Sequence, residues 1–188
     1  MPFPTDDEAL AATRHWLEAA VIGLDLCPFA QAVHSRGLIR QAVSDAATPE
    51  ALLTDLVREL HLLVDTDPAE IETTLLIHPA ALEDFLEYND FLDVAEAALE
   101  ELGLDGTIQI AGFHPDYRFA GTSPDDVTNC TNRSPYPMLH LLRESSVDRA
   151  VEAFPETHKI YEKNIETLRR LGMEGWRRRM GGDPAENG

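Results

Sequence analysis

The segment from Phe113 to Arg143 holds the densest set of side chains that could carry chemistry. Its sequence, FHPDYRFAGTSPDDVTNCTNRSPYPMLHLLR, has little regular periodicity. Loops of this length are uncommon in compact domains and are usually functional or disordered, and disordered segments contain few aromatic residues. Three further aromatic residues argue against disorder here: Tyr117, Phe119 and Tyr136. We therefore expect this segment to form a site.

Two predicted strands end in the dipeptide His-Pro. TTLLI runs into His78-Pro79, and TIQIAGF runs into His114 and its proline. The carboxyl ends of parallel strands lie at the same edge of a sheet, so we expect both histidines there. Ligands commonly bind beyond this edge. For His78 a structural role at a helix start is favoured, because proline is common at the first helical position.

His114 is the stronger candidate, because Asp116 and Tyr117 follow it in a loop. A carboxylate can fix the tautomer of an imidazole or join it on a metal, and a phenol can donate a proton. The alternative is a structural hydrogen-bond cluster that holds the loop in place.

His140 and Arg143 are three residues apart in PMLHLLRE, which we predict to be a short helix. On a helix they would share a face and could present a base beside an anion-binding group. Simple packing on a leucine stripe is the alternative. Arg133, in NRSPYP, is a second candidate for binding an anion, because the prolines that follow restrict the backbone.

Cys27 precedes Pro28, a residue typical of a helix start. A sulfur at a helix N-terminus is stabilised as thiolate, which favours nucleophilic attack or metal ligation. Cysteine is also among the most buried residue types, so an inert thiol is the alternative.

Hydrophobic periodicity predicts helices over residues 6–23, from Thr48-Pro49 onward, from Pro79 to Gly103, and over residues 155–171. Strands are predicted at LIRQAVS, TTLLI and TIQIAGF. Strands that alternate with helices indicate an α/β fold, and we expect a small, three-stranded, mainly parallel sheet of undetermined strand order with a helical C-terminal part. The 188 residues fit a single domain over residues 1–176 with a flexible tail over 177–188.

The formal net charge of -19 excludes most nucleic-acid-binding and anionic-membrane-binding proteins, because such a surface repels phosphate groups. No apolar stretch approaches the ~20 residues that span a bilayer. The first residues, MPFPTDDE, do not resemble a signal peptide, and there are two cysteines, too few for a disulfide framework. We expect a cytoplasmic protein with a small-molecule partner and no nucleic-acid or membrane partner. The sequence predicts no oligomeric state.

Several segments resemble a bacterial family of uncharacterised proteins, a domain of unknown function. They include VIGLDLCPFA, ETTLLIHP, EYNDFLD, FHPDYRFAGT, TNRSPYPMLHLLRE and YEKNIETLRRLG, which together span nearly the whole chain. The resemblance implies a bacterial cytoplasmic protein of about this length and imports no activity. The family pattern reads Gln at Arg118 and Tyr at Cys130, which makes these two residues weak candidates for shared chemistry.

Three hypotheses of function follow. The first is a small-molecule enzyme, a hydrolase or oxygenase, in which His114, Asp116 and His140 bind zinc or iron. Cys27 or His78 would complete the metal shell, and Arg133 and Arg143 would hold an anionic substrate. The second is a metal-free enzyme with Cys27 as nucleophile, His114 or His78 as base and Asp116 as its orienting group. The third is a non-catalytic metabolite-binding or accessory protein.

Overall fold

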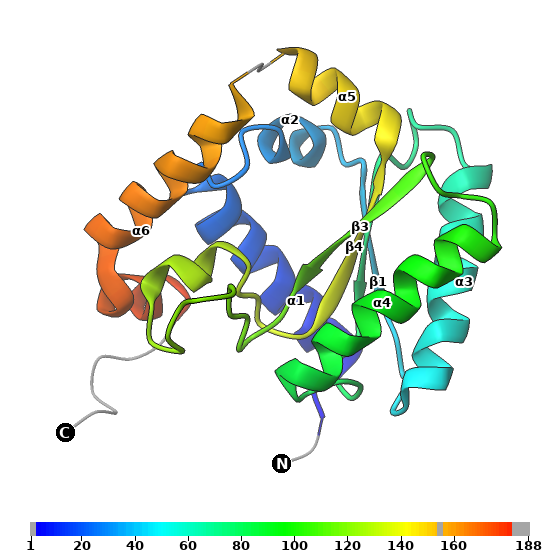
Figure 1. Ribbon diagram of the computed structural model, residues 1–188, viewed down its shortest axis with the longest axis horizontal. Coiled ribbons are helices and arrows are strands. Elements are labelled where there is room, and N and C mark those ends of the chain that lie inside the picture. The colour runs from blue at the N-terminus through cyan, green and yellow to red at the C-terminus, as the bar shows by residue number, and fades with distance from the viewer. Residues whose placement is uncertain (1–2, 154–155, 182–188) are drawn as a thin grey trace.

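The computed structural model describes residues 3–153 and 156–181, and it has an α/β fold around a four-stranded sheet (Figure 1). The strands lie in the order β1-β2-β4-β3. β1 and β2 pair in parallel, whereas β4 is antiparallel to both β2 and β3. The predicted α/β class is confirmed, but the predicted three-stranded, mainly parallel sheet is wrong because a fourth strand separates β2 from β3. The bounds are β1 (Ile39–Val43), β2 (Thr73–Ile77), β3 (Ile108–Phe113) and β4 (Met138–Arg143).

β4 occupies the segment predicted to be a short helix. MLHLLR is nearly all apolar because this strand lies inside the sheet with helices on both faces, so it lacks the alternation that marks a half-exposed strand. Successive strand residues point to opposite faces. His140 and Arg143, three positions apart, therefore lie on opposite faces of the sheet, and the prediction that they share a face is wrong.

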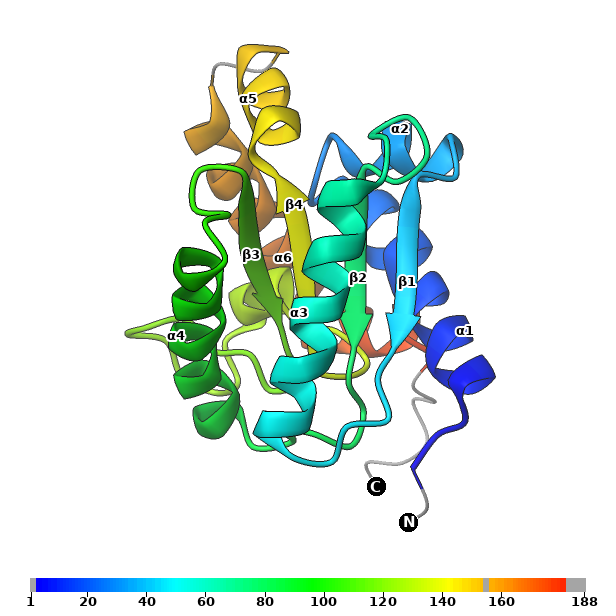
Figure 2. The ribbon, with the colours of Figure 1, turned by 90° about the vertical axis from the view of Figure 1, so that its right-hand side faces the viewer.

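Helices cover both faces of the sheet (Figure 2). α3 (Pro49–Asp65) and α4 (Phe85–Glu101) pack on one face, where their apolar side chains form a core with Leu76, Leu139 and Leu141. A second core on the other face joins Leu75 and Met138 to side chains of α1 (Asp6–Trp16), the π-helix η1 (Leu17–Ile22), the 3₁₀ helix η2 (Val127–Thr131) and α6 (Thr157–Arg179). The other two helices of the described residues are α2 (Ala30–Ser35) and α5 (Glu144–Ala153).

Local capping explains where several helices begin. Thr5 and Glu8 form a reciprocal capping box at the start of α1, and the Thr48 hydroxyl accepts a hydrogen bond from the first turn of α3. α4 does not begin at Pro79, as predicted, but after Asp84, whose carboxylate accepts two backbone N–H bonds. The residues between His78 and this cap therefore form a loop at the carboxyl edge of the sheet.

α6 bends at Gly172, whose φ of 69° is accessible mainly to glycine. The helix predicted to stop here continues to Arg179, so residues 177–179 of the predicted tail are helical. Pro155, the predicted start of this helix, and residues 182–188, the end of the predicted tail, lie outside the described residues. Among the helices of residues 3–153 and 156–181, none is long and apolar enough to cross a membrane.

Candidate functional site

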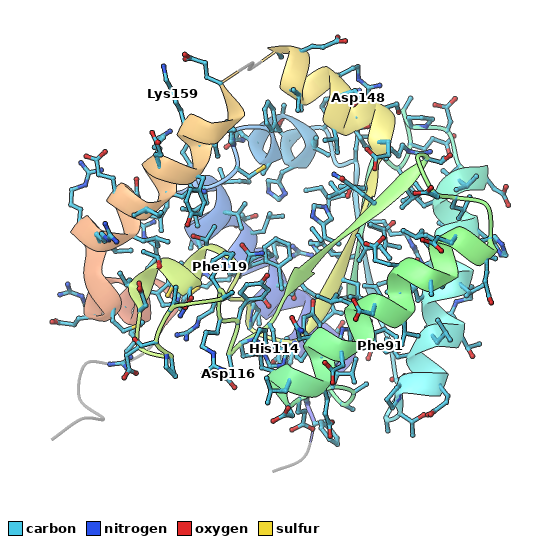
Figure 3. All side chains as sticks on the ribbon, viewed as in Figure 1. Phe91, His114, Asp116, Phe119, Asp148 and Lys159 are labelled. Atoms are coloured by element: carbon cyan, nitrogen blue, oxygen red, sulfur yellow. The ribbon has the colours of Figure 1, made fainter. Side chains whose placement is uncertain are left out.

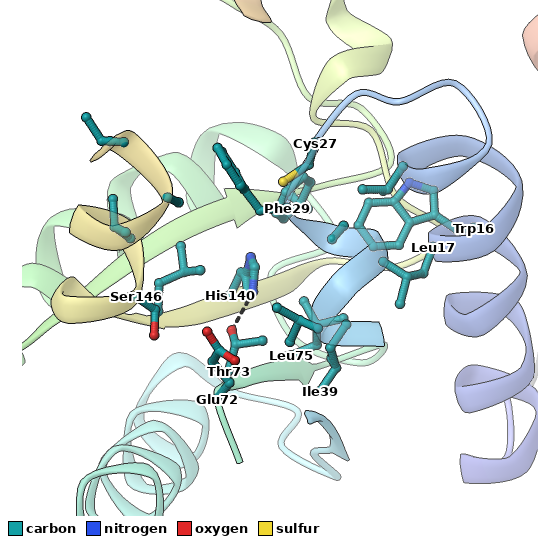
Figure 4. Close-up of a pocket in the computed structure, with 18 residues that line it drawn as sticks. Trp16, Leu17, Cys27, Phe29, Ile39, Glu72, Thr73, Leu75, His140 and Ser146 are labelled. Atoms are coloured by element: carbon teal, nitrogen blue, oxygen red, sulfur yellow. Dashed lines mark hydrogen bonds between the residues drawn. The ribbon is translucent and has the colours of Figure 1, made fainter. Parts of the chain in front are cut away.

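An apolar pocket of about 370 Å³ lies on the face of the sheet opposite α3 and α4 (Figure 4). The sheet forms one wall, and α1, η1, the segment after Cys27 and α5 form the others. Pockets with a few convergent polar groups in an apolar lining are the usual small-molecule sites. We refer to this cavity as the His140 pocket. Its lining residues are Trp16, Leu17, Val21, Cys27, Phe29, Ala30, Val33, Ile39, Glu72, Thr73, Leu75, Phe113, His140, Leu142, Ser146, Val147, Ala150 and Val151.

The position of His140 on β4 directs its ring into this pocket (Figure 4). Its Nε2 lies 2.6 Å from Thr73 Oγ1, and the same hydroxyl donates to the carbonyl of Leu141 at 2.7 Å. A hydroxyl has one proton to donate, and we assign it to the Leu141 carbonyl, which makes Nε2 the donor to Thr73. A neutral imidazole protonated at Nε2 carries its lone pair on Nδ1. Nδ1 has no hydrogen-bond partner among the described residues, so His140 offers a free acceptor to the pocket.

The surroundings keep this imidazole neutral. Burial lowers the pKa of His140 to about 4, because an imidazolium would be poorly solvated between the apolar walls. Glu72 also lines the pocket, but its carboxylate faces Arg149 at 3.4 Å and Arg36 at 3.8 Å. At neutral pH the ring can therefore accept a hydrogen bond without carrying charge.

Cys27 lines the same pocket (Figure 4). Burial raises the pKa of its thiol, although the backbone N–H groups of Phe29 and Ala30 act in the opposite direction. The expected stabilisation of the thiolate is thus outweighed by desolvation, and the sulfur is a thiol at neutral pH. No hydrogen bond joins Cys27 to His140 in the described structure.

We predict that the two cysteines react very differently with a thiol reagent. In the native protein Cys27 should react slowly at pH 7 and faster as the pH rises beyond the ~8.5 of a free thiol. Cys130 is fully buried with its pKa raised to about 11, so it should react only after denaturation. Ellman titration of the wild type and of Cys27→Ala and Cys130→Ala measures each thiol. Rapid native labelling that is already complete at pH 7 and independent of further pH increase would contradict this assignment.

His114 lies at the end of β3 with Asp116 beside it (Figure 3). Its Nδ1 accepts from the backbone N–H of Asp116 at 3.0 Å, and its Nε2 donates to the carbonyl of Leu82 at 3.1 Å. Both ring nitrogens are therefore occupied by the backbone. Leu82 has a positive φ of 58°, so His114 stabilises a strained turn in the loop before α4.

His78 lies in the same aromatic cluster as His114, as expected from the shared edge of the sheet. The ring centroid of Tyr88 is 6.0 Å from that of His78 and 5.0 Å from that of His114. His78 Nδ1 donates to the carbonyl of Ala81 at 2.9 Å, and burial lowers the pKa of His78 to about 4. The contacts of both histidines hold the loop between β2 and α4.

The three proposed metal ligands do not come together. His140 faces the His140 pocket, whereas His114 lies against Tyr88 and Phe85 of α4 on the other face of the sheet. The Asp116 side chain is exposed. Within residues 3–153 and 156–181, no group of three or more His, Cys, Asp or Glu side chains is placed to hold a metal ion. The same separation puts Cys27 across the sheet from His78 and His114, its proposed bases.

Tyr117, the proposed proton donor, packs against Phe85 and Phe119 at centroid distances of 5.3 and 5.1 Å. Burial raises the pKa of its phenol, so the hydroxyl stays protonated at neutral pH. Tyr117 belongs to the aromatic cluster at the strand ends and does not line the His140 pocket.

Arg143, proposed to bind substrate, is 8% exposed and lies on the α3 face of the sheet. Its guanidinium donates to the carbonyls of Leu63, Thr66 and Ile71 at 2.6, 2.7 and 3.0 Å. A cation at the C-terminal end of a helix satisfies its last carbonyls and complements its dipole. Arg143 is therefore a cap for α3, and this burial does not fit the predicted role in anion binding.

Arg133, the other proposed anion-binding residue, donates hydrogen bonds to backbone carbonyls of its own loop. Its Nη2 donates to the carbonyl of Pro124 at 2.6 Å, and its Nε donates to the carbonyl of Tyr117 at 3.3 Å. It lines a second cavity and not the His140 pocket. The two arginines thus do not share a site.

Sequence reasoning found Cys27 and His140 but missed the residues that complete the pocket. Thr73 decides the tautomer of His140, and it lies in a strand whose apolar character gave no reason to select it. Trp16 and Phe29 form walls of the pocket from elements that are distant from β4 in sequence. Only the pairing of β2 with β4 brings Thr73 to His140.

A family model described as "Protein of unknown function (DUF1415)" matches residues 8–178 of the chain. The matched region contains every residue that lines the His140 pocket. No curated protein and no solved structure matches the chain.

Proposed function

Because the chain belongs to the DUF1415 family, whose description names no activity, we propose its function from the His140 pocket. This function is the binding of a small, mostly apolar molecule that carries one hydrogen-bond donor. The molecule's apolar part would lie against the aliphatic and aromatic walls. Its donor would face Nδ1 of His140.

The observation that carries this proposal is the free lone pair of His140 in an otherwise apolar cavity. An acceptor that faces an apolar cavity is poorly solvated, and a ligand that supplies a donor compensates it. The neutral ring favours a neutral donor such as a hydroxyl or an amide N–H. A carboxylate would find no positive charge, because no lysine or arginine lines the pocket in the described structure. The anionic substrate expected from the sequence is therefore not part of this proposal.

A matched pair of ligands tests the role of His140. 4-Propylphenol and propylbenzene share an apolar body, but only the phenol donates a hydrogen bond. We expect the ratio of their dissociation constants, measured by calorimetry, to shift about tenfold against the phenol in His140→Leu, as expected for one buried hydrogen bond. His61→Leu, at an exposed position of α3, is the control. An unchanged ratio in His140→Leu, or no binding of either compound to the wild type, would overturn the proposal.

A second candidate function is a metal-free enzyme with Cys27 as nucleophile. It is supported by the presence of Cys27 and His140 in one pocket, where Nδ1 could take the thiol proton. The raised pKa of Cys27 opposes it. A covalent adduct formed with an apolar ester by the wild type, but not by Cys27→Ala or His140→Leu, would support this candidate over binding alone.

A further inference from the structure

A second cavity, of about 380 Å³, lies between α1, the loop that follows β3 and the C-terminal part of α6. The bend at Gly172 turns the end of α6, which lies beside η2 (Figure 1). We call this cavity the two-tryptophan cavity. The lining residues used below are His15, Trp16, Asp125, Arg133, Trp176 and Arg177.

Two guanidinium groups line this cavity without a paired carboxylate. Neither Arg133 nor Arg177 forms an ion pair with a residue of the described ranges, although acidic residues outnumber Lys and Arg by 34 to 15. Burial raises the pKa of the Cys130 thiol, and the charges of Arg133 and Arg177 both oppose this effect. Asp125 lies at the same cavity but pairs with neither.

Arg133 is held in a fixed position. Its bonds to the carbonyls of Pro124 and Tyr117 orient the guanidinium, which also interacts with the thiol of Cys130. Trp16 is fixed as well, since its indole N–H donates to the carbonyl of Arg133 at 2.8 Å. A ligand would therefore meet a preorganised cation beside an aromatic wall, which lowers the entropy lost on binding.

We propose that the two-tryptophan cavity binds a small organic anion, a carboxylate or a phosphate on a compact apolar group. Arg133 and Arg177 would pair with the oxyanion, and Trp16 and Trp176 would pack on the apolar group. This site is separate from the His140 pocket, and its ligand class differs because its lining is charged. The two guanidinium groups of Arg133 and Arg177 line one cavity in a chain of net charge -19, and this local positive charge favours an anionic ligand.

Tryptophan fluorescence reports directly on this cavity, because Trp16 and Trp176 are the two tryptophans of the chain. The probes are benzoate, phenyl phosphate, inorganic phosphate and neutral benzyl alcohol, titrated at constant ionic strength. We expect a saturable response to benzoate or phenyl phosphate, and the tighter of the two identifies the head group. Trp16 also lines the His140 pocket, whereas Trp176 does not. The fluorescence response should therefore persist in Trp16→Phe, in which Trp176 is the reporter.

Arg177→Gln is expected to weaken the binding of the preferred anion about tenfold, and Arg177→Lys should restore part of the affinity. Arg170→Gln is the matched control: it removes the same charge from an exposed position of α6 that does not line the cavity. Thermal melting checks that each variant is folded. Equal weakening by Arg170→Gln and Arg177→Gln would overturn the proposal, as would the absence of any saturable response. So would tight binding of inorganic phosphate or benzyl alcohol to Trp16→Phe, equal to that of the aromatic anions, with Trp176 as the reporter.

Discussion

Replacing Arg143 with methionine is expected to lower the free energy of unfolding by about 3 kcal/mol, the largest stability effect we predict for a single substitution. Methionine fills much of the same volume but cannot donate to the carbonyls of Leu63, Thr66 and Ile71. These carbonyls would lose a charged donor, and α3 would lose the cation at its C-terminus. In a chain of this size the melting temperature should fall by roughly 6–12 °C.

Arg149→Met is the matched control for this experiment. Arg149 lies six residues further along the chain, its side chain is 60% exposed, and it contacts Glu72 at 3.4 Å. An exposed pair of this kind contributes at most about 1 kcal/mol. Urea unfolding of both variants measures the difference. Equal destabilisation would show that Arg143 is not a structural cap.

Ala150→Trp is expected to remove most of the affinity of the His140 pocket for 4-propylphenol. Ala150 lines the pocket from α5, so an indole at this position would occupy space that the ligand needs. Loss of about 100 Å² of apolar contact costs on the order of 2.5 kcal/mol, which weakens binding roughly 70-fold. Calorimetric titration measures this change.

Ala97→Trp provides the control, because Ala97 is exposed on α4 on the other face of the sheet. It adds the same indole without approaching the pocket, and affinity should not change. If Ala150→Trp binds the phenol as tightly as Ala97→Trp while both variants remain folded, the ligand binds elsewhere.

Much of the fold follows from local signals in the sequence. The capping box of Thr5 and Glu8, the Thr48-Pro49 helix start and the run TTLLI, which has three β-branched residues, each predict the observed element, because they depend on nearby residues. β4 could not be predicted in this way. A short apolar run is compatible with helix or strand, and its pairing with β2 and β3 is a long-range property.

The error in β4 also explains what the sequence missed at the site. On a helix His140 and Arg143 would lie on one face. On the strand Arg143 contacts α3, whereas His140 contacts Thr73 and lines a pocket with Cys27. The shared edge of His78 and His114 was predicted correctly, yet Nδ1 of His78 and both ring nitrogens of His114 bond backbone groups of loops whose turns the sequence did not reveal. The zinc or iron site and the cytoplasmic location stay predictions, and the positions of His114, Asp116 and His140 give the metal site no support.

The most direct test of the central claim is a ¹⁵N NMR pH titration of the His140 ring, with its signals assigned by their loss in His140→Leu. We predict a proton on Nε2 and a lone pair on Nδ1 at pH 7, with no protonation of the ring until the pH approaches about 4. 4-Propylphenol should shift the Nδ1 signal, and propylbenzene should shift it far less. A proton on Nδ1, a pKa near the ordinary 6.5, or equal shifts with both compounds would contradict the proposal that His140 is the hydrogen-bond acceptor of this pocket.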